Sequence, residues 1–162
     1  MKVPEIDQLR NRRPEPEEAL NLFKHSELDS LIKIASQLRD QQHGKVISYS
    51  KKVFIPLTKL CRDVCHYCTF SREPLNNQPC FMRPDEVLKL VQDGEKLGCK
   101  EVLFTVGDKP EMRYQKCRKE LQELGHESTI SYLAEISKMD LESTSLLPHI
   151  NAGVMSSSEL AK

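Results

Sequence analysis

Apolar residues recur at helical spacing in the first 44 residues, after an irregular beginning. Residues 1–14 carry no periodic apolar signal, which predicts a loose arm. Pro14, Pro16 and the acidic residues after them indicate the first turn of a helix that continues through Phe23, because proline is accepted there and acidic side chains suit the helix dipole. A second helix, ended by Gly44, is predicted by five apolar residues at intervals of three or four: Leu28, Leu31, Ile32, Ala35 and Leu38.

After residue 44 the pattern changes to short runs of β-branched and aromatic residues, which favour strands. Two such runs, 46–49 and 53–55, lie close together, and Pro56 follows them. Proline lacks the amide that a strand ladder needs, so we expect a strand end or a sheet edge there. Further strands are predicted at 101–106 and 146–154. Helices are predicted at 84–98, at 113–124 and from Ser128 onward.

Strands that alternate with helices predict an α/β fold with a parallel sheet and right-handed crossovers. In such folds the reactive groups gather at the carboxyl ends of the strands. Two unusual segments directly follow predicted strands: the cysteine-rich run 61–68 and the Gly-Asp-Lys-Pro-Glu run 107–111. The sequence therefore predicts one site built from both segments.

Charge and hydropathy narrow the class of protein. The 162 residues include 24 basic and 24 acidic side chains, mixed along the chain, so no overall field favours nucleic acid or an anionic membrane. No apolar run is long enough to cross a bilayer, and the polar, acidic beginning does not resemble a signal peptide. We expect a cytoplasmic protein that binds neither nucleic acid nor membrane.

Three of the six cysteines, Cys61, Cys65 and Cys68, fall within eight residues, close enough together to bind a metal. A structural zinc site needs four ligands, so Cys80 or His66 would have to complete it. An iron–sulfur cube held by three thiolates instead leaves one iron open, unlike ferredoxin clusters with four cysteines. The spacing alone leaves three interpretations open: an iron–sulfur cluster, a zinc site and a chance arrangement of cysteines. The preceding strand, Tyr67 and the downstream α/β units favour iron, and an open iron suits chelation by S-adenosylmethionine.

The pattern Cys-x3-Cys-x2-Cys, with an aromatic residue before the last cysteine and in a loop after the first strand, resembles the radical S-adenosylmethionine superfamily. More narrowly, the chain from about Ala19 to its end is similar to the family of 7,8-didemethyl-8-hydroxy-5-deazariboflavin synthases. Four segments carry this resemblance: YSKKVFIPLTKLCRDVCHYCTF (49–70), LFTVGDKPE (103–111), LGHEST (124–129) and LPHINAGVM (147–155).

The resemblance implies a radical lyase that forms the deazaflavin chromophore from a hydroxybenzyl adduct of ribitylamino-uracil, with loss of ammonia. It implies a sister radical enzyme that supplies the adduct, and a low-potential electron donor such as ferredoxin or flavodoxin. A 4Fe–4S cluster on Cys61, Cys65 and Cys68 and bound S-adenosylmethionine are the implied cofactors. Another radical enzyme of the superfamily and a non-catalytic zinc-binding module are the alternatives.

Further residues carry over from the family pattern. Gly107 and Asp108 stand where the superfamily contacts the amino group of S-adenosylmethionine, although that element is often Gly-Gly-Glu, and Tyr67 is expected beside the cofactor. The superfamily core is a partial barrel of six β/α units, whereas this sequence predicts about three. We therefore expect an N-terminal helical arm at 1–44 and, at 45–162, the N-terminal half of a barrel, truncated and of doubtful activity alone.

The remaining polar residues have plainer interpretations. Glu111 is expected either to bind cofactor or substrate or to be an exposed loop carboxylate. His66 is expected to face solvent, and His149 to make a structural hydrogen bond. Asn151 is a further candidate for the site. Cys80, Cys99 and Cys117 are expected to be structural, since free cysteine packs as a small apolar residue.

Overall fold

The computed structural model describes residues 12–161 and divides the chain into two compact units, 1–48 and 49–162. Most of the arm predicted at 1–14 lies outside the described residues. Each unit is described by itself.

The first unit contains two helices, α1 (Pro16–His25) and α2 (Leu28–His43). The first turn of α1 is fixed by a capping box, in which the Glu18 carboxylate accepts a hydrogen bond of 2.9 Å from the Glu15 amide. Gly44 ends α2 with φ of 63°, a conformation that favours glycine. Both predicted helices are confirmed. Helix α2 has no fully buried residue; within its apolar stripe Leu28 and Ile32 are exposed, and Leu31 and Leu38 are partly buried.

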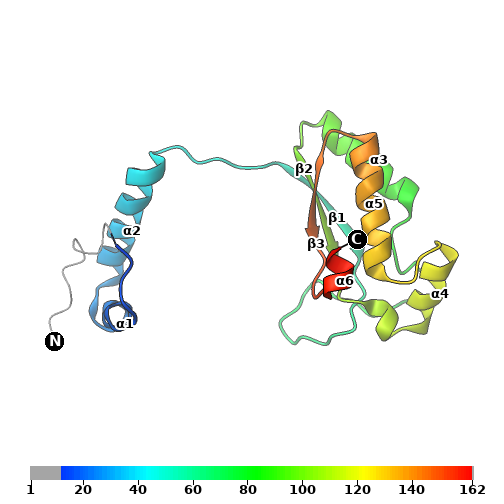
Figure 1. Ribbon diagram of the computed structural model, residues 1–162, viewed down its shortest axis with the longest axis horizontal. Helices are drawn as coiled ribbons and strands as arrows, with labels where there is room; N and C mark the ends of the chain where they lie inside the picture. Colours follow the sequence, from blue (N-terminus) through cyan, green and yellow to red (C-terminus); the bar gives the residue numbers. More distant parts are fainter. Residues whose placement is uncertain (1–11, 162) are drawn as a thin grey trace. The chain divides into compact units, whose positions relative to one another are not determined.

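The second unit is built on three parallel strands in the order β1-β2-β3 (Figure 1). These are β1 (Lys52–Thr58), β2 (Glu101–Val106) and β3 (Leu147–Asn151). Val53, Val102 and Pro148 lie side by side in the register. Pro56 lies on β1, which is an edge strand, as its missing amide predicts. The strand predicted at 46–49 is wrong, because that segment is extended and exposed and pairs with no strand.

One face of the sheet carries the core. Helices α3 (Pro84–Lys96) and α5 (Thr129–Ser143) pack on this face, where Ile55, Val102 and Phe104 are fully buried (Figure 1). The opposite face is open and includes Phe54 and Leu147, both more than half exposed. The alternation along β2, with every second residue buried, follows from this one-sided packing.

Three shorter helices complete the second unit: η2 (Pro110–Met112), α4 (Gln115–Glu123) and α6 (Ser157–Leu160). The segments that follow β1, β2 and β3 all leave the same edge of the sheet, since the strands are parallel. The predicted α/β fold with a parallel sheet is confirmed. No helix within residues 12–161 is long and apolar enough to cross a membrane.

Candidate functional site

The cysteine triad lies in the loop that leaves β1 at the carboxyl edge of the sheet. Cys61 is half-buried, whereas Cys65 and Cys68 are exposed. Tyr67 is 88% exposed and His66 faces solvent, as predicted for His66. The loop turns back on itself at the last cysteine, where the Cys68 amide donates to the Cys65 carbonyl at 3.1 Å. All three thiols are free of disulfides.

Backbone amides point at two of the three sulfur atoms. Cys61 Sγ accepts hydrogen bonds from the amides of Asp63 (3.4 Å) and Asp108 (3.3 Å). Cys68 Sγ accepts one from the Ser71 amide at 3.4 Å. Amide donors of this kind stabilise a thiolate and surround the sulfur ligands of iron–sulfur clusters. The donor set therefore fits a metal–thiolate centre in its chemistry.

The geometry of the triad is open. In the part of the chain that the structure describes, no group of three or more His, Cys, Asp or Glu side chains lies close enough together to hold a metal ion. The three sulfur atoms come from one short, largely exposed loop, so a ligand can draw them together without unfolding the sheet.

Gly107 brings the end of β2 against the loop of the triad. Its amide donates to the Thr58 carbonyl at 3.0 Å. A Cβ atom at this position would lie 1.9 Å from the Leu60 carbonyl oxygen and 3.0 Å from the Cys61 Cβ. Only glycine permits this approach, which sets Asp108 beside Cys61.

Asp108 is fixed by Arg62. The Arg62 Nε donates to Asp108 Oδ2 at 2.5 Å, and the Arg62 amide donates to the Asp108 carbonyl at 2.9 Å. The other carboxylate oxygen, Oδ1, is buried and has no hydrogen-bond partner among the described residues. It faces Gly153, where a Cβ would lie 3.1 Å away. The structure thus brings Gly107 and Asp108 to Cys61, and leaves one acceptor oxygen of Asp108 unpaired.

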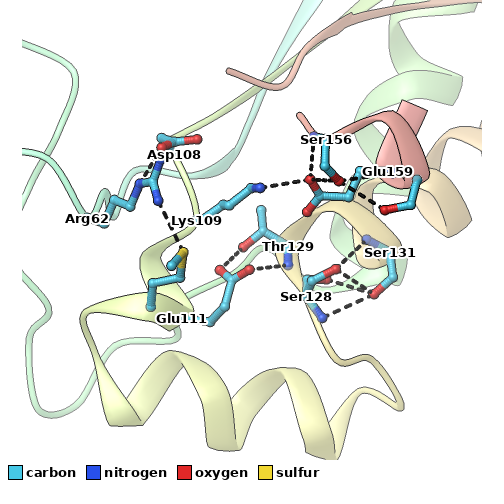
Figure 2. A network of polar contacts seen from close by, with 11 residues as sticks. Arg62, Asp108, Lys109, Glu111, Ser128, Thr129, Ser131, Ser156 and Glu159 are labelled. Carbon is cyan, nitrogen blue, oxygen red and sulfur yellow. Dashed lines mark hydrogen bonds and ion pairs between the residues drawn. The ribbon is translucent and has the colours of Figure 1, made fainter. Parts of the chain in front are cut away.

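A second polar network holds the segment after β2 in place (Figure 2). Lys109 has φ of 36°, and its ammonium donates to Glu159 of α6 at 2.8 Å. Glu111 is buried, and its carboxylate accepts hydrogen bonds from the amide (3.0 Å) and hydroxyl (2.6 Å) of Thr129 at the start of α5. Of the two alternatives for Glu111, the exposed loop carboxylate is wrong, because this buried carboxylate caps a helix; a role for Glu111 in binding cofactor or substrate stays a prediction.

The Lys109–Glu159 pair predicts a stability change at acidic pH. Hydrogen bonds from Lys109 and from the Ser156 amide lower the pKa of Glu159 to about 2. A carboxyl group with a lowered folded-state pKa stabilises the fold above its unfolded pKa of ~4.3, and this stabilisation is lost as the pH falls toward 2. We expect Glu159→Gln to reduce the drop in unfolding temperature between about pH 5 and pH 3.

Thermal unfolding followed by circular dichroism measures this effect. The exposed Glu127 makes no hydrogen bond or ion pair among the described residues, so Glu127→Gln is the matched control and should leave the drop unchanged. An equal drop for Glu159→Gln and the unchanged chain would show that the pair does not stabilise the fold.

A cavity of about 450 Å³ lies between β1 and the segment 72–82. Helix α4 holds that segment through two side chains one turn apart. The Lys116 ammonium donates to the carbonyls of residues 75, 76 and 78, and the buried Glu120 carboxylate accepts from the amides of Cys80 (2.8 Å) and Phe81 (3.1 Å). The cavity wall formed by the segment 72–82 therefore depends on α4.

Glu120→Ala is expected to destabilise the chain by ~2–4 kcal/mol, because two buried amides lose a charged acceptor. Urea unfolding measures the loss. The exposed Glu123 lies on the same helix, and Glu123→Ala is the control, expected to change stability by less than ~0.5 kcal/mol. A similar small change for both variants would contradict a clamping role for Glu120.

The remaining candidates make no hydrogen bond to the sulfur atoms of the triad among the described residues. Cys80, Cys99 and Cys117 are buried in the core, as expected for structural cysteines, and burial raises the pKa of the Cys80 and Cys117 thiols. His149 Nδ1 lies 2.8 Å from Lys52 Nζ and 3.2 Å from a Glu101 carboxylate oxygen, which confirms a structural hydrogen bond. Asn151 is exposed at the end of β3, opposite Thr105, and its role stays a prediction.

Sequence reasoning missed Arg62, Thr129 and Glu159. The only local signal was the Ser-Ser-Ser-Glu run at 156–159, a helix-start pattern in which Ser156 and Glu159 form a capping box. Arg62 and Thr129 gave no signal, because their partners lie 46 and 18 residues away in the sequence.

Comparisons with known proteins point to the same family as the resemblance of the sequence. No protein-family model matches the chain. The FO synthase of Mycobacterium tuberculosis is 46% identical over 150 residues, which cover 84% of this chain and 18% of that protein. The FO synthase of Mycobacterium leprae is 53% identical over 120 residues (72% and 14%), and the 7,8-didemethyl-8-hydroxy-5-deazariboflavin synthase of Methanopyrus kandleri is 46% identical over 117 (72% and 35%).

Two solved structures share the fold. The FeFe-hydrogenase maturase HydG from Carboxydothermus hydrogenoformans has a TM-score of 0.66 at 21% identity and covers 97% of this chain, which spans 34% of HydG. Methylornithine synthase PylB has a TM-score of 0.63 at 16% identity, with coverage of 95% and 42%.

The parallel sheet, its one-sided helices and these likenesses define a partial (β/α) barrel with the fold of HydG and PylB, and so confirm the predicted fold class. Within that class, the chain belongs to the family of FO synthases, the 7,8-didemethyl-8-hydroxy-5-deazariboflavin synthases. It spans 14–35% of the length of the three synthases named above.

Proposed function

We propose that this chain carries the cluster-binding part of a radical S-adenosylmethionine lyase that forms 7,8-didemethyl-8-hydroxy-5-deazariboflavin. The observation that supports it most is the identity of 46–53% to synthases of this name, combined with a cysteine triad at the carboxyl edge of a parallel sheet. The substrate would be a hydroxybenzyl adduct of ribitylamino-uracil, which closes a ring and loses ammonia.

Cys61, Cys65 and Cys68 would hold a 4Fe–4S cluster through three of its irons. The unpaired thiols and the amides directed at Cys61 and Cys68 support this assignment. When bound, the cluster and S-adenosylmethionine would supply a 5′-deoxyadenosyl radical able to remove hydrogen from an unactivated carbon. Zinc coordination completed by Cys80 is disfavoured, because the Cys80 thiol is buried in the core and its pKa is raised by burial.

The chain's own residues bind and orient the cofactor. Gly107 would contribute to the cofactor site by holding the end of β2 against the triad's loop, and Asp108 would offer its unpaired, buried Oδ1 to a donor such as the amino group of S-adenosylmethionine. Tyr67 is exposed beside the last cysteine and would cover the cofactor with its ring. Water exclusion at the open face of the sheet would require further elements of a complete barrel.

The same proposal includes partners and location. A sister radical enzyme would supply the adduct, and a low-potential donor such as ferredoxin or flavodoxin would reduce the cluster. We place the protein in the cytoplasm, where free thiols persist. The domain division at 44/45 belongs to this proposal as well.

The function is tested by anaerobic reconstitution of the chain with iron and sulfide, followed by dithionite and S-adenosylmethionine. Support would be a brown protein that releases 5′-deoxyadenosine, with deazaflavin fluorescence when the adduct is added. Release of 5′-deoxyadenosine without deazaflavin would support the cluster-binding part alone, as expected if conversion of the adduct needs further elements of a complete barrel. A colourless chain that retains one zinc would contradict the proposal.

A further inference from the structure

Arg62, directly after the first cysteine, joins the triad's loop to the segment after β2 through four contacts. Figure 2 shows the one between its guanidinium and the Asp108 carboxylate. Besides its two hydrogen bonds to Asp108, its guanidinium donates to Met112 Sδ at 3.2 Å, and its carbonyl accepts from Arg113 at 3.4 Å. These four contacts, together with those of Leu60 and Cys61 to residues 107 and 108, join residues 60–63 to residues 107–113. We call the whole set the Arg62 clasp.

The clasp includes the hydrogen bond that reaches the sulfur of Cys61. The Asp108 amide that donates to Cys61 Sγ belongs to the residue whose carbonyl and carboxylate are both held by Arg62. Gly107 packs against Leu60 on the same side. Arg62 therefore fixes the distance between this amide and the Cys61 sulfur, although it does not touch the sulfur itself.

The other two cysteines lie outside the clasp. Cys65 and Cys68 are exposed, and within residues 12–161 the only hydrogen bond to either sulfur comes from the Ser71 amide, inside the same loop. One thiol of the triad is thus tied to the sheet while the other two are carried by the loop alone.

We propose that Arg62, with Asp108 as its partner, is a positioning residue that presets Cys61 and its amide donor before any metal binds. Cys61 then serves as the fixed anchor of the site, and Cys65 and Cys68 close onto it. The cofactor side of this inference rests on the proposed function, while the preset thiol is a property of the metal-free chain. Amide bonds to a sulfur ligand also tune the cluster that it holds.

Thiol alkylation of the metal-free chain by iodoacetamide tests the clasp, with each cysteine quantified by mass spectrometry. In Arg62→Gln we expect Cys61 to react about tenfold faster, because its half-buried sulfur becomes more exposed when the contacts to Asp108 are lost. A tenfold change corresponds to ~1.4 kcal/mol. Cys65 and Cys68 should keep their rates. Asp108→Asn should act in the same direction.

Loss of the nearby positive charge and loss of the amide donor both predict the opposite sign for Arg62→Gln, because each of these groups favours the reactive thiolate; a faster Cys61 therefore reports greater exposure of its sulfur. Lys59→Gln controls for the effect of charge, since Lys59 is exposed two residues before Cys61 and no hydrogen bond or ion pair of its side chain is found among the described residues. We expect no acceleration of Cys61 in Lys59→Gln.

The buried Cys80 and Cys117 report on unfolding in the same experiment. If Cys80 and Cys117 also become reactive in Arg62→Gln, the variant has unfolded and Arg62→Lys replaces it as the test. Lysine keeps the positive charge but lacks the several donors of the guanidinium. In Arg62→Lys, Cys61 should react faster while Cys80 stays protected. An unchanged Cys61 rate, or equal acceleration of all three triad cysteines, would overturn the positioning role.

A cluster readout separates this inference from the proposed function. If the unchanged chain binds about four irons, Arg62→Gln should alter the electron paramagnetic resonance spectrum of the reduced cluster while iron content stays above half. An unaltered spectrum would overturn the tuning role of the clasp. Failure of the unchanged chain to bind iron would refute the proposed function, yet leave the alkylation result to decide whether Cys61 is preset.

Discussion

Serine at Cys61, Cys65 or Cys68 is expected to reduce the iron bound after anaerobic reconstitution from about four atoms per chain to fewer than one. A cube on three thiolates has no spare protein ligand, and a hydroxyl is a much weaker ligand for iron than a thiolate. Iron and acid-labile sulfide assays, together with the visible absorption of the cluster, measure the loss.

Two further variants make this result specific. Cys99→Ala removes a buried thiol that packs in the core and should keep its iron. Cys80→Ala distinguishes the metals: under the zinc alternative it would release metal as readily as Cys65→Ser, whereas a three-cysteine cluster should survive it. Parallel loss of metal from Cys80→Ala and Cys65→Ser would contradict the triad assignment.

Gly107→Ala is expected to destabilise the chain by ~3 kcal/mol, at the upper end of the range for overpacking. The added methyl group would lie 1.9 Å from the Leu60 carbonyl oxygen. The amides of Gly107 and Leu60 both donate to Thr58, to its carbonyl and its hydroxyl respectively, so neither backbone segment is free to shift. Relief would require the end of β2 to move away from the triad's loop. Urea unfolding measures the stability, and the alkylation rate of Cys61 should rise because the half-buried thiol becomes more exposed when the end of β2 moves away.

Gly94 offers a matched comparison within α3. A Cβ there would also lie 1.9 Å from a neighbouring atom, but that atom is the terminal Cγ2 of Val53, which a side-chain rotation can move. Alanine also improves helix propensity by ~1 kcal/mol over glycine. We therefore expect Gly94→Ala to cost less than half as much as Gly107→Ala. Equal costs would show that the backbone contact at Leu60 is not special.

Sequence reasoning predicted best those elements that combine a regular apolar pattern with a glycine that marks their end. Strand β2 matches its predicted range because an apolar run ends at Gly107, and α2 matches because periodic leucines end at Gly44. The strand expected at 46–49 failed because β propensity needs a neighbouring strand, and Val46, Ile47 and Tyr49 are all about 80% exposed or more.

The site was predictable in its location but not in its contacts. Cysteine spacing and strand order placed the triad beside Gly107, since parallel strands end at one edge. The contact between Arg62 and Asp108 depends on the register of β1 against β2, which shifts between Pro56 and Thr58. No local pattern encodes that shift, so the clasp and the buried cap formed by Glu111 emerge only in three dimensions.

The open iron is tested most directly by electron–nuclear double resonance of the reduced, reconstituted chain with S-adenosylmethionine labelled with ¹⁵N at its amino group and ¹⁷O at its carboxylate. Chelation of the fourth iron predicts hyperfine coupling from both labels, and that coupling should disappear with unlabelled cofactor. A reduced cluster whose spectrum shows coupling to neither label would contradict a site for S-adenosylmethionine on this chain.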